Sequence, residues 1–237
     1  MFAVIGGSGL TQVPELQITR RQIVRTPYGL PSAPLLIGKL GSQEIVFLAR
    51  HGLSYTLAPH EINYRANIWA LHSLGIHNII SVSAVTSLNP ALEAGSLVLP
   101  DDLIDYTFAR AATYFEGESQ EIIHADFSDP YDIQLRDTLL AHADSHRTPL
   151  HNRAIYGCIQ GPRTPTRAEM RRYRNDGIDI IGMTGMPEAI LARELNIPYV
   201  HLCGVVYHAD SSEQSTHLRS EQTHHAISKI RQLLVDL

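Results

Sequence analysis

Short apolar runs alternate with amphipathic helical stretches along the whole of this 237-residue chain, and this alternation limits the folds open to it. Strands and helices that follow one another in this way favour a three-layer α/β/α arrangement around a mixed, largely parallel twisted sheet. No internal repeat, low-complexity tract or linker breaks the pattern, so we expect a single domain over residues 1–237. The expected strands cover residues 2–5, 31–41, 43–48, 78–83, 95–100, 154–160, 178–181 and 198–207. The expected helices cover residues 63–75, 130–142, 167–177, 187–196 and 222–237.

One junction between a strand and a helix combines residues suited to holding an anion. The apolar run 178–181 leads to Thr184, and Pro187 suits the start of the helix that follows. Upstream, Thr166 and Glu169 have the spacing of a capping box, which predicts a helix beginning just after Thr166. Ligands in open α/β sheets gather outside the carboxyl ends of the strands, and a helix N-terminus favours negative charge. The Thr184 hydroxyl is therefore a candidate anion ligand, although an ordinary turn has the same composition.

Polar side chains also follow four other expected strands. They are Ser8 in a Gly-rich turn, the adjacent pair Arg50 and His51, Ser83, and Tyr207. Each of these positions taken singly has the composition of an ordinary turn or loop. Hydroxyl groups and a guanidinium that recur at strand ends suit an oxyanion such as phosphate, held by neutral and charge-assisted hydrogen bonds together.

Composition excludes several classes of protein. The formal net charge is −5 and no basic run is present, so we expect no nucleic-acid partner. No apolar stretch reaches the roughly 18 residues of a membrane span, and the N-terminus lacks the features of a signal peptide. We therefore expect no membrane association and a cytoplasmic protein, in which Cys158 and Cys203 are reduced core residues. The 13 histidines show no metal-binding spacing, which predicts no metal.

Six motifs together resemble one known family. They are IGGSGL at residues 5–10, RHG at 50–52, INYRANIWAL at 62–71, SVSAVTSLNPALEAGSLVLPDDLID at 81–105, GPR at 161–163 and GMTGMPEA at 182–189. In this order they resemble the trimeric methylthioadenosine phosphorylase and purine nucleoside phosphorylase family over nearly the whole chain. The last motif is most similar to the bacterial branch of S-methyl-5'-thioinosine phosphorylases.

The resemblance implies a reaction and an assembly. Phosphate attacks C1' of a purine nucleoside while the bond to the base breaks through an oxocarbenium-like state, and a (methylthio)ribose 1-phosphate and a free purine result. Inorganic phosphate is a co-substrate, and no cofactor, metal or covalent intermediate is implied. The resemblance also implies a role in purine salvage and a homotrimer, or a dimer of such trimers.

The resemblance also assigns roles to individual residues. It implies Arg50, His51 and Tyr207 as catalytic residues. The implied phosphate-binding residues are Ser8, Arg50, His51, Ser83, Ala84 and Thr184. The implied substrate-binding residues are Met183, Tyr207, His208, Ala209, Thr164, Pro165 and, reaching a neighbouring subunit near the nucleoside 5' end, His124.

The sequence departs from the family pattern around the base. Relatives that act on 6-aminopurines carry two aspartates where this chain has Tyr207 and Ala209, and those that act on 6-oxopurines carry asparagine at the first position. Thr164 replaces the aromatic residue that stacks on the base, and Tyr55 replaces a histidine. A shift of one residue brings Asp210 to the second position. His224 is either a plain helix residue or a contact to a ribose hydroxyl.

These departures leave the substrate open. S-methyl-5'-thioinosine or a 6-oxopurine nucleoside is the leading prediction. S-methyl-5'-thioadenosine phosphorylase activity is one alternative, and a catalytically weakened purine-binding homologue is another.

Overall fold

The computed structural model describes residues 1–10, 13–117, 121–210, 216–235 and 237. The strands are β1 (Phe2–Gly6), β2 (Gln17–Gln22), β3 (Leu35–Leu40), β4 (Gln43–Ala49), β5 (Asn78–Ser87), β6 (Leu97–Val98), β7 (Asp102–Asp105), β8 (Leu150–His151), β9 (Ile155–Cys158), β10 (Ile180–Gly182) and β11 (Tyr199–His208). The helices are α1 (Tyr64–Ser73), α2 (Ile133–Ser145), α3 (Arg167–Asn175), α4 (Glu188–Glu194) and α5 (Thr216–Val235).

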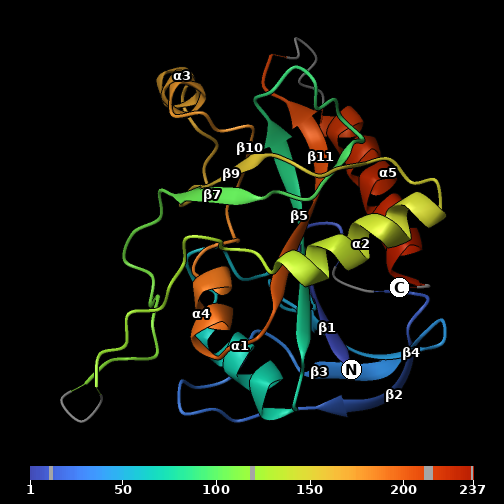
Figure 1. The fold of residues 1–237 in the computed structure, drawn as a ribbon, viewed down its shortest axis with the longest axis vertical. Helices are drawn as coiled ribbons and strands as arrows, with labels where there is room; N and C mark the ends of the chain where they lie inside the picture. Colours follow the sequence, from blue (N-terminus) through green and yellow to red (C-terminus); the bar gives the residue numbers. More distant parts are fainter. Residues whose placement is uncertain (11–12, 118–120, 211–215, 236) are drawn as a thin grey trace.

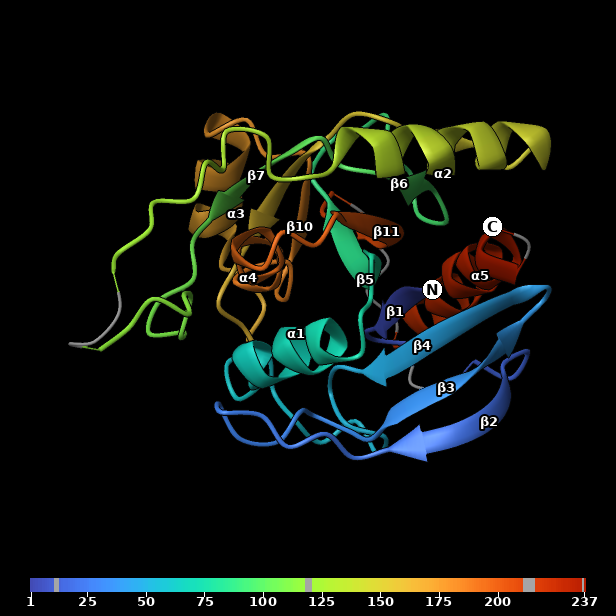
Figure 2. The same cartoon turned by 60° about the horizontal axis from the view of Figure 1, so that its bottom comes forward.

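A single mixed sheet runs through the described part of the molecule (Figure 1). Its main path has the strand order β2-β3-β4-β1-β5-β10-β9-β7, and β11 pairs with β5 and β6. The pairs β1–β4, β1–β5 and β11–β5 are parallel, whereas β10 runs antiparallel to β5. Helices α1 and α4 pack together on one side of β5 and β11, and α5 packs on the other side (Figure 2). The predicted three-layer α/β/α fold with a mixed, largely parallel sheet is confirmed.

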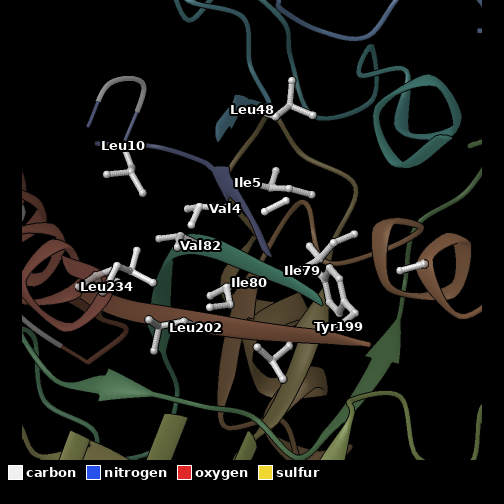
Figure 3. Packing of buried hydrophobic residues seen from close by; sticks show 14 of the residues in the cluster. Val4, Ile5, Leu10, Leu48, Ile79, Ile80, Val82, Tyr199, Leu202 and Leu234 are labelled. Atoms are coloured by element: carbon white, nitrogen blue, oxygen red, sulfur yellow. The ribbon is translucent and has the colours of Figure 1, made fainter. Parts of the chain in front are cut away.

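The core lies between these layers because β5 and β11 are covered on both faces. Seven consecutive residues of β11, from Tyr199 to Val205, are buried, as are most of β5. Figure 3 shows side chains from β1, β5 and β11 packed against residues of α5, among them Val4, Ile80, Leu202 and Leu234. Each fully buried aliphatic side chain of this kind contributes about 1.5–3 kcal/mol.

Local sequence signals set several element boundaries as predicted. Thr166 and Glu169 form a capping box, because each side chain accepts a hydrogen bond from the backbone N–H of the other, at 3.2 and 2.7 Å. Asn63 caps α1 by accepting a hydrogen bond from the backbone N–H of Ala66. Pro187 is the N-cap of α4, one residue before the helix begins, so the prediction that it is the first helical residue was one residue early.

Other elements differ from the predictions. Helix α5 begins at Thr216, six residues earlier than expected, and the strand expected over residues 95–100 shortens to β6. Strands β2 and β7 were not predicted because their residues, QITRRQ and DLID, lack the apolar alternation that marks a strand. Strand β8 has only two residues. None of the described helices is both long and apolar enough to cross a membrane.

The position of Ser83 in the sheet differs from the expected one. Strand β5 does not end at Ser83 but continues to Ser87, while its neighbour β1 stops at Gly6, just beyond the pairing of Ile5 with Ser81. Because β10 is antiparallel to β5, the turn that follows Gly182 lies next to the middle of β5. The polar residues therefore gather where β1 and β4 end, against the middle of a longer strand.

Candidate active site

A cavity of about 320 Å³ opens at this place in the sheet. All six residues predicted to bind phosphate line it, and they form its polar end: Ser8, Arg50, His51, Ser83, Ala84 and Thr184. Three of the predicted substrate contacts, Met183, Thr164 and Pro165, line it as well. The fold thus brings together predicted residues from segments that are far apart in sequence.

Arg50 follows β4 and is fully buried. Its Nη1 donates to Ser81 at 2.8 Å and to both carboxylate oxygens of Glu188 at 2.9 and 3.0 Å. Burial opposes the positive charge, but the carboxylate of Glu188 outweighs this effect, so the pKa of Arg50 lies above its usual value. The arginine is held as a permanent cation beside the cavity.

Glu188 is the counter-charge of Arg50, and its role was not predicted from the sequence. It is fully buried in the first turn of α4, where the helix dipole favours an anion. Besides Arg50 it accepts hydrogen bonds from Ser81 and from the phenol of Tyr199, the latter at 2.9 Å. The only sequence signal is a glutamate directly after Pro187, which is equally typical of an ordinary helix start.

The Gly-rich turn after β1 packs directly on Arg50. A Cβ atom at Gly7 would lie 2.5 Å from Nη2 of Arg50 and 2.7 Å from the carbonyl oxygen of Val82, so only glycine fits. The next residue, Ser8, has its hydroxyl 2.5 Å from that of Tyr55. Tyr55, one of the departures from the family pattern, therefore holds the predicted phosphate ligand Ser8 in place.

His51 is neutral in this site. Its Nδ1 lies 2.8 Å from the carbonyl oxygen of Leu57, so the ring proton is on Nδ1 and Nε2 carries a lone pair. Burial, together with the nearby charge of Arg50, lowers the pKa of His51 to about 4. The imidazole is thus a hydrogen-bond acceptor at neutral pH.

Two hydroxyl groups meet beside Arg50. The Oγ of Ser83 accepts from Nη2 of Arg50 at 3.0 Å and lies 3.1 Å from Oγ1 of Thr184. The phenol oxygen of Tyr156 accepts from the backbone N–H groups of Thr184 and Gly185, at 3.3 and 3.2 Å. These contacts fix the turn after β10 so that the Thr184 side chain lies against β5.

A second cavity of about 650 Å³ continues from the first. Both are lined by Thr86, Thr164, Pro165, Ile181 and Val206. The second is lined also by Tyr207 of β11, by Ala209 and Asp210 just after that strand, and by Arg167, Arg171 and Arg174 from α3. The two cavities form one groove with a buried polar end and an open end between β11 and α3.

A family model described as the phosphorylase superfamily matches residues 1–237. The chain belongs to this superfamily. It is 47% identical to a probable S-methyl-5'-thioinosine phosphorylase of Pseudomonas syringae pv. tomato, over 87% of this chain and 84% of the relative. It is 43% identical to the 6-oxopurine nucleoside phosphorylase of Pyrococcus furiosus, over 91% of this chain and 83% of the relative.

A solved structure is also very similar. Methylthioadenosine phosphorylase from Schistosoma mansoni, in complex with adenine, superposes with a TM-score of 0.93 and 28% sequence identity. The match covers 99% of this chain and 89% of that one. The resemblance drawn from the six sequence motifs is confirmed.

Some predicted residues of this superfamily member lie apart from both cavities. His124 is exposed and lies on the long connection between β7 and α2, which projects from the body of the molecule (Figure 2). His208, the last residue of β11, lines neither cavity, and its Nδ1 accepts a hydrogen bond from the backbone N–H of Asp210. His224 is exposed, while Thr223 beside it lines the first cavity.

Asp210 lines the second cavity. The pairing of β11 with β5 changes register between Val205 and Tyr207, which makes a bulge. The Asp210 carboxylate then accepts from Nη2 of Arg174 at 2.6 Å. Among the described residues, no group of three or more His, Cys, Asp or Glu side chains is placed to hold a metal ion.

Proposed function

We propose that this protein cleaves a purine nucleoside by phosphorolysis, giving the free base and the sugar 1-phosphate. The observation that carries the proposal is the polar end of the groove, in which the buried Arg50, a neutral His51, the buried hydroxyl residues Ser83 and Thr184 and the half-buried Ser8 converge. Such a set is suited to an oxyanion. A purine-binding protein without this chemistry has no need of a buried cation next to its ligand cavity. The names of the curated relatives support the same reaction.

Phosphate would lie at this polar end. The two terminal nitrogens of Arg50 are engaged by protein groups, and its Nε has no partner among the described residues, so Nε is the donor left for an anion. Nε2 of His51 can accept the proton of a monohydrogen phosphate. The cation and the hydroxyl donors then orient the unprotonated oxygens toward C1', which supplies proximity and charge stabilisation.

The sugar and base would occupy the rest of the groove. Met183 lines the first cavity together with Thr164 and Pro165, and we assign the ribose to Met183 and the purine to the segment of Thr164 and Pro165. As the glycosidic bond breaks, negative charge builds on the purine. The phenol of Tyr207 lines the open end of the groove, where the base would lie, and can donate a hydrogen bond, so we assign it to that charge.

The open end of the groove, where we place the purine, has a lining that favours a 6-oxopurine. Arg167, Arg171 and Arg174 line it and offer donors, which suit the carbonyl oxygen at position 6 and repel an amino group there. The Asp210 carboxylate, an acceptor for an amino group, is already paired with Arg174. We therefore assign S-methyl-5'-thioinosine or a 6-oxopurine nucleoside as substrate, with a role in purine salvage.

The same proposal includes the assembly and its surroundings. We assign a homotrimer in which His124 reaches the 5' end of the nucleoside bound to a neighbour. Ile122 and Ile123, beside it on the projecting connection, are 72% and 56% exposed, as a subunit contact requires. The two free, buried cysteines, Cys158 and Cys203, suit the cytoplasm.

Base release from four nucleosides tests the reaction. The purified protein is incubated with S-methyl-5'-thioinosine, S-methyl-5'-thioadenosine, inosine and adenosine, each with and without phosphate. We expect release only with phosphate and fastest with a 6-oxopurine substrate. Release without phosphate would contradict phosphorolysis, and no release from any nucleoside would favour a purine-binding protein.

S-methyl-5'-thioadenosine is the second candidate substrate. Asp210 lines the open end of the groove, and the solved structure of the relative from Schistosoma mansoni is a complex with adenine. If Asp210 leaves Arg174 when a base binds, its carboxylate can accept from a 6-amino group. Comparison of Asp210→Asn with the wild type decides this point: a selective loss with the thioadenosine substrate supports the second candidate, and no change removes it.

A further inference from the structure

His201 lies behind the polar end of the groove and lines neither cavity. It is fully buried on β11, at a position paired with Ser81 of β5. Its Nε2 lies 2.8 Å from Oγ of Ser83, which in turn contacts Arg50 and Thr184. The imidazole therefore has a hydrogen-bond link to the candidate phosphate site through the Ser83 hydroxyl.

The surroundings of the ring determine which nitrogen carries the proton. Burial and the charge of Arg50 lower the pKa of His201 to about 3, so the ring is neutral and has one N–H. Nδ1 has no hydrogen-bond partner among the described residues. A buried N–H without an acceptor costs more than an unused lone pair. The proton is therefore on Nε2, and His201 donates to Ser83.

This donation determines the direction of the next hydrogen bond. The Ser83 oxygen has two lone pairs, and both are taken, one by His201 and the other by Nη2 of Arg50. Its own proton must then point to Oγ1 of Thr184, 3.1 Å away. Thr184 becomes the acceptor in this pair, and its hydroxyl proton remains available to the cavity.

We infer that His201 is a positioning residue: by donating to Ser83 it orients the hydroxyl chain so that Thr184 offers a hydrogen bond to bound phosphate. The inference rests on the proposed phosphate site. The unprotonated oxygens of phosphate only accept hydrogen bonds, so a chain of hydroxyl groups that ends in a donor binds them and a chain that ends in a lone pair repels them. Without His201, the Ser83–Thr184 pair is free to reverse.

The turn after β10 is built to admit this ring. A Cβ atom at Gly185 would lie 3.0 Å from both Nδ1 and Cε1 of His201 and 2.7 Å from Cε1 of Tyr156. The Tyr156 ring stands edge-on to the imidazole, with centroids 4.7 Å apart. A side chain at position 185 would therefore collide with the imidazole and with Tyr156, and glycine next to Thr184 leaves the room that the ring needs.

Three substitutions of His201 in the full-length protein test the inference. His201→Gln places an amide nitrogen near the position of Nε2 and keeps a donor for Ser83. His201→Asn is also polar but too short to reach Ser83, and His201→Met fills the space without a donor. The measured quantities are the KM for phosphate, the KM for the nucleoside, kcat, and phosphate affinity by calorimetry without nucleoside.

We expect the Met and Asn variants to raise the phosphate KM and the calorimetric Kd roughly tenfold or more, which is the usual effect of losing a hydrogen bond to a charged group. The Gln variant should stay within about threefold of the wild type, and the nucleoside KM should change little in all three. Asn and Gln remain a test if the Met variant does not fold.

Two results would overturn the inference. One is an unchanged phosphate KM in the Asn variant, and the other is an equal loss of phosphate and nucleoside affinity in all variants, as a purely structural role would give. Failure of the proposed function would look different, because the wild type itself would then release base without phosphate or not at all.

Discussion

Arg50 carries its positive charge without access to solvent, so its neighbours determine whether that charge is tolerated. Glu188 supplies the opposite charge at 2.9 Å, and Ser81 and Tyr199 occupy further lone pairs of the same carboxylate. A buried ion pair of this kind adds little net stability, but removing one partner strands the other. The pair is better understood as the arrangement that keeps a buried cation beside the cavity.

Replacing Glu188 should therefore damage phosphate use as well as stability. Glu188→Gln keeps the shape but removes the counter-charge, and we expect a loss of about 3–5 kcal/mol in the free energy of unfolding. We also expect at least a tenfold higher KM for phosphate, because Arg50 is no longer held in place. Denaturant unfolding and steady-state kinetics measure the two effects. Glu93→Gln, on an exposed glutamate, is the control.

Tyr55, which replaces a histidine of the family pattern, contacts two of the residues predicted to bind phosphate. Its hydroxyl lies 2.5 Å from that of Ser8, and its ring packs 4.7 Å from that of His51. Tyr55→Phe should raise the phosphate KM about threefold to tenfold through the loss of one hydrogen bond, while Tm changes little because Tyr55 is 50% exposed. A change confined to the nucleoside KM would place Tyr55 at the sugar instead.

At the scale of elements, α3 forms one wall of the open end of the groove and depends on its own capping box. Thr166 and Glu169 hold its first turn, and Arg163 adds two hydrogen bonds to the same glutamate. The helix buries only Tyr173, so little tertiary packing supports it. Local hydrogen bonds carry a large share of its stability for this reason.

Thr166→Ala tests this dependence. Loss of an N-cap side chain costs about 1 kcal/mol, and here the loss should be local to α3. We expect faster backbone hydrogen exchange over residues 167–175 and a higher KM for the nucleoside, with the phosphate KM unchanged. Thr138→Ala, on the exposed part of α2, is a control without a capping role. Unchanged exchange in α3 would show that the box is dispensable.

The secondary-structure elements also show which parts of the fold and of the site can be predicted from the sequence. Apolar runs and caps predicted β1, β5, β10, α1 and α3, and the motifs at their ends predicted the residues that meet in the first cavity. The partners of those residues were not predictable in the same way. Arg50 and Glu188 are 138 residues apart, and Ser83 and His201 are 118 apart. Glu188 lies within the motif GMTGMPEA, but nothing in that motif marks it as the partner of Arg50, and His201 lies in none of the six motifs. The packed sheet brings both residues to the site.

At the scale of the whole molecule, two buried neutral histidines couple folding to pH. The pKa values of His51 and His201 are lowered to about 4 and about 3 by burial and by the charge of Arg50. Tyr156 and Tyr199 also lie against the His201 ring. In the unfolded chain both histidines titrate near their ordinary value of about 6.5. The unfolded state therefore binds more protons than the folded state below that pH.

Stability should consequently fall as the pH is lowered from about 6.5 to about 4, by an amount on the order of a few kcal/mol, and should be fully present above this window. Thermal unfolding measured across pH 4–8 checks the direction. His201→Gln removes one of the two groups and should flatten the slope without reversing it. An identical slope in this variant would show that other groups dominate the acid response.

The length of β5 has a consequence for how such an enzyme changes its preferences. This one strand carries Ser83 at the buried end of the groove and Thr86 where the two cavities join, so a single rigid element spans both functions. Three residues that differ from the family pattern, Thr164, Tyr207 and Ala209, lie on other segments around the open end, whereas a fourth, Tyr55, lies beside Ser8 at the polar end. Substitutions at the open end can thus alter the choice of base while β5 stays the same, which makes the groove a favourable starting point for engineering nucleoside selectivity.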